Sequence, residues 1–132
     1  MRLDFCMEMV PPTVTAQEHK VRIVNGKPVF YDTARIKAAR RQLTDALIAN
    51  RPPEALTGPV ELSVCWHFPR GRHKDGEYRV TRPDTDNLQK LLKDCMTTAG
   101  FWTDDAQVVR EHVEKRWAEV PGINIQVEEI QV

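Results

Sequence analysis

The sequence lacks several features that would place it in a class at once. None of its 132 residues belongs to an apolar run near the ~20 residues that a membrane-spanning helix needs. It has no internal repeat, no low-complexity segment, and no basic segment followed by an apolar one, so we expect no secretory signal. A chain of this length is expected to form one domain, residues 1–132, around a single core.

Cysteine and histidine are also scarce. Cys6, Cys65 and Cys95 are an odd number and form no Cys-x-x-Cys pair, and the four histidines lack the spacing of zinc ligands. Each cysteine falls in a predicted strand or helix, so we expect buried, reduced thiols. A protein of this kind is typical of the cytoplasm.

An excess of charge of either sign is missing too, because 19 basic residues balance 19 acidic ones. A neutral chain does not by itself favour DNA as a partner, since phosphate contacts need lysine and arginine. The charges are polarised, however. Residues 35–41 carry four basic and no acidic residues, and residues 69–82 carry five basic against two acidic ones. These segments supply the candidate DNA contacts, Arg35, Lys37, Arg40, Arg41, Arg70, Arg72, Lys74, Arg79 and Arg82.

Each basic segment also has a plainer interpretation. Residues 35–41 would be the solvated face of a helix. Residues 69–82 are polar and contain two glycines, so we expect a mobile loop. That loop either contacts DNA or is a simple excursion into solvent.

Hydrophobic periodicity predicts an α+β domain. Strands are expected over residues 2–10, 21–24, 29–31, 60–68, 107–117 and 123–127, and helices over residues 33–50 and from about 86 to 99. Asn25-Gly26 predicts a hairpin turn, and Gly100 is expected to end the second helix. In the strand 107–117, Val109, Val113 and Trp117 are expected to share one face. The strands would form a mixed sheet of about four to six strands, with both helices on one face.

Two acidic clusters flank the second helix. The first is Asp84 and Asp86, which are good N-cap residues, and the second is Asp104 and Asp105. On the helix, Asp86, Lys90 and Asp94 follow one another at intervals of four residues and therefore share a face. Clustered carboxylates favour a bound cation, and oxygen ligands suit Mg²⁺ or Mn²⁺. The plainer alternative is that these aspartates only cap a helix and form a turn.

This segment closely resembles the RusA family of Holliday-junction resolvases. The matching pieces are PDTDNLQKLLKD at 83–94, AGFW at 99–102 and DDAQV at 104–108. The resemblance implies a homodimeric, Mg²⁺-dependent DNA endonuclease that cuts four-way junctions in recombination and repair, and it favours a prophage origin. It implies that Asp84, Asp86 and Asp105 bind the metal and that Lys90 is catalytic. Asp94 and Asp104 stand at positions that are usually acidic in the family.

Three other functions remain open at this point. A protein with this fold could bind DNA junctions without cutting them, although all four expected catalytic residues are present. A Ca²⁺-binding module is disfavoured, because the twelfth position of an EF-hand loop beginning at Asp84 would be Cys95 rather than glutamate. A phosphatase or phosphotransferase would need a larger domain, and no glycine loop that could hold phosphate is present.

Overall fold

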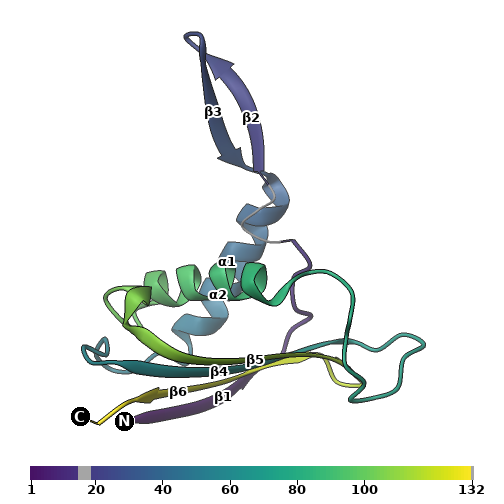
Figure 1. Ribbon diagram of the computed structural model, residues 1–132, viewed down its shortest axis with the longest axis vertical. Coiled ribbons are helices and arrows are strands. Elements are labelled where there is room, and N and C mark those ends of the chain that lie inside the picture. Colours follow the sequence, from purple (N-terminus) through teal and green to yellow (C-terminus); the bar gives the residue numbers. More distant parts are fainter. Residues whose placement is uncertain (15–18, 132) are drawn as a thin grey trace.

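The computed structural model describes residues 1–14 and 19–131. Its elements are β1 (Arg2–Met7), β2 (His19–Val24), β3 (Lys27–Asp32), α1 (Ala34–Ile48), β4 (Val60–Pro69), α2 (Thr85–Ala99), the 3₁₀ turn η1 (Asp105–Gln107), β5 (Val108–Ala118) and β6 (Gly122–Glu129). Both helices lie on the same side of a twisted sheet, and a hairpin projects away from this body (Figure 1).

The main sheet has four strands in the order β1-β6-β4-β5. β6 is antiparallel to β1 and to β4, whereas β4 and β5 are parallel. Two parallel neighbours cannot be joined by a tight turn, so the chain crosses over the sheet between them through α2. The expected α+β class, with a mixed sheet and two helices, is confirmed.

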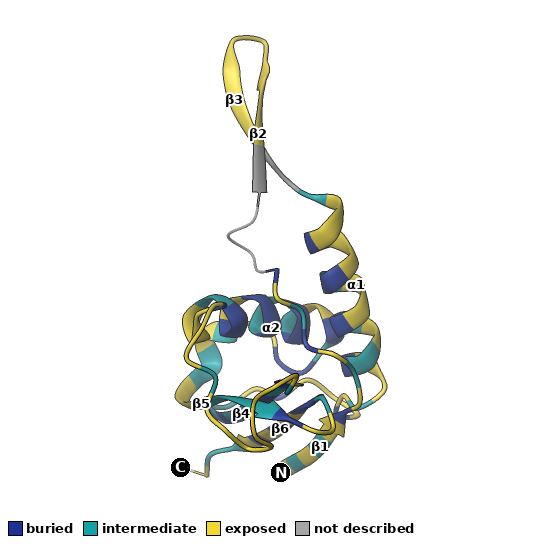
Figure 2. Cartoon of the chain, turned by 90° about the vertical axis from the view of Figure 1, so that its right-hand side faces the viewer, coloured by how far each residue is buried: buried dark blue, intermediate teal, exposed yellow. Residues whose placement is uncertain are grey.

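The core lies between this sheet and the two helices (Figure 2). Strict alternation along β4 buries its apolar side chains, namely Val60, Leu62, Val64, Trp66 and Phe68. α2 contributes a wide apolar face, including Leu88, Leu92 and Met96, and α1 packs beside it. The opposite face of the sheet carries polar residues and has no helix over it among the described residues.

Local signals explain where the helices begin and end. The Thr33 hydroxyl caps α1 by accepting a hydrogen bond from the Ile36 amide at 3.3 Å. Gly100 ends α2 with a left-handed φ of 96°, a conformation that glycine adopts without steric cost. α2 begins at Thr85, one residue before the predicted start. Neither described helix is both long and apolar enough to cross a membrane.

Three local predictions were wrong, namely one strand boundary, the burial of two cysteines and the orientation of Val109. β1 ends at Met7, so the first strand is shorter than expected. Only Cys95 is buried, because Cys6 and Cys65 lie on the polar face of the sheet, although all three thiols are free. Val109 is 60 % exposed, because the pairing of β4 with β5 slips at this point and Val108 takes the core position instead.

The predicted hairpin is present but detached. Asn25 and Gly26 both have positive φ, at 51° and 76°, as a tight turn between two strands requires. β2 pairs only with β3, and the described side chains from Val21 to Val29 are all exposed. The side chains described for the hairpin, from Val21 to Val29, therefore form no core.

Candidate active site

The first acidic cluster lies where the chain enters α2. Asp84 occupies the N-cap position with an extended backbone, yet its carboxylate makes no capping hydrogen bond. Asp86 lies in the first turn of the helix, where the helix dipole stabilises a negative charge. Both residues are exposed. The interpretation of Asp84 as a mere cap therefore fails, and its oxygens stay available for another partner.

The two members of the second cluster differ from each other. The Asp104 carboxylate accepts a hydrogen bond from the Ala106 amide at 2.9 Å, and the Gln107 side chain accepts one from the Asp104 amide at 3.1 Å. This reciprocal capping box fixes η1, so Asp104 has a structural role. Asp105 follows it and faces a pocket.

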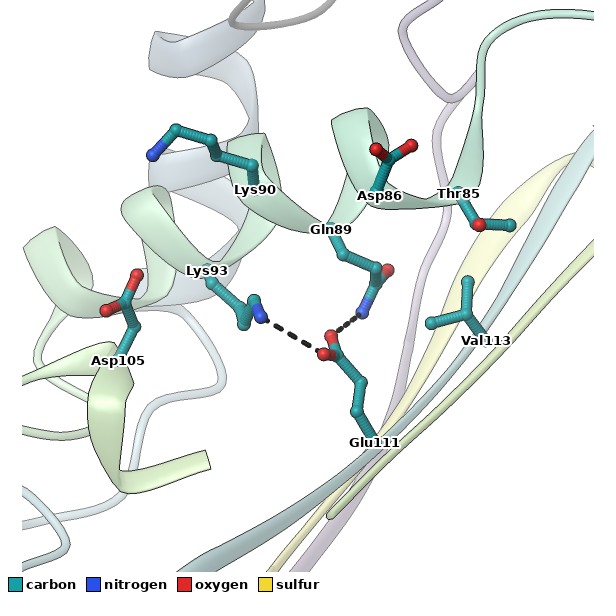
Figure 3. Close-up of a pocket in the computed structure, with 8 residues that line it drawn as sticks. All are labelled: Thr85, Asp86, Gln89, Lys90, Lys93, Asp105, Glu111 and Val113. Carbon is teal, nitrogen blue, oxygen red and sulfur yellow. Dashed lines mark hydrogen bonds and ion pairs between the residues drawn. The ribbon is translucent and has the colours of Figure 1, made fainter. Parts of the chain in front are cut away.

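That pocket, of about 490 Å³, lies between α2 and β5. It is lined by Thr85, Asp86, Gln89, Lys90, Lys93, Asp105, Glu111 and Val113. Figure 3 shows Asp86 and Asp105 at opposite ends of this group, with Lys90 and Lys93 between them. Three predicted catalytic residues therefore line a single open pocket, and Asp84 lies just before it in the chain.

The topology places the acidic clusters at the two ends of α2. The crossover brings Asp84 and Asp86 to the start of α2, and Asp105 follows its end. A helix of 15 residues therefore lies between the clusters, and Asp86 and Asp105 line the same pocket from its two ends. Among residues 1–14 and 19–131, no three His, Cys, Asp or Glu side chains form a group that could hold a metal ion.

Lys90 and Asp94 form the expected pair on the surface of α2. The Lys90 ammonium lies 3.8 Å from the Asp94 carboxylate, which is also 3.7 Å from the Arg40 guanidinium. Asp94 thus links α2 to α1. The Lys90 side chain remains 65 % exposed and lines the pocket, so a weak surface pair does not prevent it from reaching a phosphate group.

A chain of hydrogen bonds runs from the buried Gln89 to the pocket, and it was not predicted from the sequence. Gln89 is 3 % exposed; its side-chain oxygen accepts from the Trp66 indole at 2.8 Å, and its amide donates to Glu111 at 2.7 Å. The other oxygen of Glu111 accepts from Lys93 at 3.0 Å (Figure 3). The spacing of Gln89 to Leu92 and Met96 was the available signal, since it places a polar residue on the apolar face.

The segment 70–83 is not a free loop. Its backbone extends the edge of β5: the Gly76 amide donates to the Trp117 carbonyl at 2.8 Å, and the Arg79 amide donates to the Lys115 carbonyl at 3.0 Å. The Arg79 guanidinium stacks on the rings of Phe68 and Trp117, at 4.3 and 4.5 Å from their centroids. The prediction of a mobile loop over residues 69–82 is therefore wrong, because the segment 70–83 is bound to the edge of the sheet.

This docking divides the predicted DNA contacts into two groups. Arg70 pairs with Glu119 and Arg79 is stacked, so both cations are used within the protein. Burial lowers the pKa of Arg79. Among the predicted DNA contacts, five exposed side chains have no hydrogen bond or ion pair within the described part of the chain: Arg72, Lys74 and Arg82 in this segment, and Lys37 and Arg41 on α1. Arg35 is also exposed on α1, and Arg40 is half-buried beside Asp94.

Comparison with known proteins agrees with the motif. The family model described as Endodeoxyribonuclease RusA matches residues 10–128. A crossover junction endodeoxyribonuclease of Lactococcus phage r1t is 31 % identical over 98 % of this chain and 100 % of its own length. The Escherichia coli K12 protein RusA, also named as a crossover junction endodeoxyribonuclease, is 45 % identical over 46 % of this chain and 42 % of its own length. The Bacillus subtilis protein YqaN, which is uncharacterized, is 29 % identical over 82 % of this chain and 84 % of its own length.

Proposed function

Because the chain belongs to the endodeoxyribonuclease RusA family, we propose that it resolves four-way DNA junctions by hydrolysing phosphodiester bonds. The observation that carries this proposal is the pocket beside α2, which Asp86, Lys90 and Asp105 all line. Its openness suits a phosphate on a large substrate better than an enclosed small molecule. Two relatives are named as crossover junction endodeoxyribonucleases, so branched DNA is the substrate class that we propose.

The cation would be Mg²⁺, with Mn²⁺ as a substitute. Asp84, Asp86 and Asp105 supply only oxygen ligands, which these ions prefer. Magnesium is commonly bound through one or two carboxylates together with substrate phosphates, so a closed protein cage is not required. When bound, the cation would polarise the phosphate and activate water. Asp84 and Asp86 are both exposed, and the Asp84 carboxylate makes no capping hydrogen bond, which supports this assignment.

Lys90 would act on the phosphate itself. Lys90 lines the pocket with its side chain 65 % exposed, and its neighbour Asp94 also pairs with Arg40. A fixed positive charge next to the scissile group stabilises the charge that develops in the transition state.

Paired nicks in the two strands would come from a homodimer with two active sites. Light scattering of the purified protein would test this oligomeric state.

The first experiment is cleavage of a synthetic four-way junction, with linear duplex as the control substrate. Asp84→Asn, Asp86→Asn and Asp105→Asn should each abolish cleavage in Mg²⁺ while a gel-shift assay without metal still detects junction binding. Asp45→Asn, an exposed carboxylate on α1 outside the pocket, is the matched control. Full cleavage in EDTA would contradict the metal mechanism.

The second experiment separates the two roles of Lys90. If Lys90 only forms a surface pair with Asp94, its removal should lower the free energy of unfolding by ~0.2–0.5 kcal/mol and leave the cleavage rate unchanged. If it faces the phosphate, Lys90→Ala should bind junctions but cleave them about a hundredfold more slowly in single-turnover assays. Lys90→Arg should recover only part of the rate. A rate within about threefold of wild type would reject the catalytic role.

A further inference from the structure

Three consecutive backbone carbonyls immediately before Asp84 are bound by cationic side chains. The Lys115 ammonium donates to the Thr81 carbonyl at 2.8 Å and to the Pro83 carbonyl at 2.7 Å. The Arg79 guanidinium donates to the intervening carbonyl of Arg82. A stretch of chain with no regular secondary structure is therefore held at every residue that leads into the active site.

The sheet fixes the position of Lys115 and, through it, of this segment. Lys115 lies on β5 opposite Trp66 of β4, near the centre of the parallel pair. Its own carbonyl accepts the Arg79 amide at 3.0 Å, so the strand holds the segment through both backbone and side chain. Pro83 is buried, whereas Asp84 directly after it is exposed. The clamp therefore ends at the point where the chain turns its carboxylate to solvent.

The chemistry of the clamp explains why a lysine suits this position. An ammonium has three donors and no acceptor, so it can bind two carbonyls on one flexible stem. Bonds from a charged donor are stronger than neutral ones. Partial burial and the nearby Arg79 lower the pKa of Lys115, and the charge of Asp84 opposes that shift.

We propose that Lys115 is a positioning residue of the nuclease site, which acts by holding the Thr81 and Pro83 carbonyls so that Asp84 enters α2 in one fixed orientation. This inference rests on the proposed function of Asp84. It assigns to Lys115 no contact with DNA. A catalytic group that is misplaced by about 1 Å can cost on the order of a hundredfold in rate, so a distant clamp can matter greatly.

The test uses the full chain with three variants. Lys115→Met keeps the stem and loses the donors, and Lys115→Arg keeps the charge with another shape. Arg110→Met is the matched control, because Arg110 is on the same strand, pairs with Glu61 and lies outside the pocket. Each variant is measured for single-turnover junction cleavage, the Mg²⁺ concentration at half-maximal rate, metal-free junction binding with its salt dependence, and amide hydrogen exchange.

We expect Lys115→Met to cleave about ten- to a hundredfold more slowly and to need more Mg²⁺. Lys115→Arg should restore the rate only in part. Metal-free junction binding and its salt slope should match wild type, and hydrogen exchange should become faster only from residue 81 to the first turn of α2. Arg110→Met should behave as wild type in all four measurements.

Other results would overturn the proposal. A salt slope that falls by about one unit would make Lys115 a phosphate contact. Faster exchange throughout the sheet, or unchanged cleavage, would leave it as an ordinary structural lysine. If wild type cut no junction at all, the proposed function would fail instead. The exchange comparison would then still decide whether Lys115 holds the segment before Asp84.

Discussion

Two segments with basic residues leave the sheet-and-helix body, and the structure treats them in opposite ways. The hairpin β2–β3 has the more regular sequence, but it stands away from the body, and its described apolar side chains are exposed (Figure 2). The segment 70–83 has an irregular, polar sequence, yet backbone bonds and stacked cations fasten it to β5. A segment with regular secondary structure therefore does not necessarily pack against the rest of the fold.

The two segments differ in the arrangement of their basic side chains. In the segment 70–83, Arg79 stacks on two aromatic rings and donates to a carbonyl, so its guanidinium is bound within the protein. In the hairpin, the pairing of Arg22 with Val29 and of Val24 with Lys27 mixes basic and apolar side chains on one face. The other face, with Val21, Ile23 and Pro28, is apolar. A two-stranded ribbon of this kind is marginal in water by itself.

The largest effect should come from breaking the attachment of the segment 70–83. Arg79→Ala removes both ring contacts and the bond to the Arg82 carbonyl, so we expect a loss of about 2 kcal/mol in the free energy of unfolding. Urea unfolding measures it. Arg72→Ala, which alters an exposed arginine of the same segment, should stay within about 0.5 kcal/mol of wild type. Equal stability of the two variants would mean that the stacking contributes nothing.

An intermediate effect should appear in DNA binding. Arg72→Ala and Lys74→Ala should each lower the salt slope of junction binding by about one unit, because their charges are not used within the protein. Arg70→Ala should lower it less, since Arg70 already pairs with Glu119. Gel-shift titrations over a range of salt concentrations provide the slopes. A uniform decrease in all three variants would show that DNA displaces the internal partner of Arg70.

Much of the fold was predictable because its signals are local. The alternation of β4, the caps Thr33 and Gly100, and the turn at Asn25 each follow from a few adjacent residues. The slip of one residue at Val109 was not predictable, because it depends on how β5 pairs with β4. The same limit applies to the docking of the segment 70–83, which requires Trp117 and Lys115 from a strand more than thirty residues away.

In the candidate site, too, some features were predictable from adjacent residues, and others depend on residues far apart in the sequence. The motif identified Asp84, Asp86, Lys90 and Asp105, and the pocket gathers three of them. That these residues share one pocket depends on how α2 packs against β5 and η1, which periodicity does not reveal. The functions of Asp104 as a cap and of Asp94 as a link to α1 also depend on neighbours that only the folded chain supplies.

The smallest effect should come from the hairpin. Ile23 is 70 % exposed on its apolar face, so Ile23→Ala should change the free energy of unfolding by less than about 0.5 kcal/mol. Ile125→Ala is the matched control, because Ile125 is fully buried on β6 and its truncation should cost ~2–5 kcal/mol. Urea unfolding of both variants measures the contrast. If Ile23→Ala proved as costly as Ile125→Ala, the apolar face of the hairpin would have to be covered in solution, and its independence from the body would be disproved.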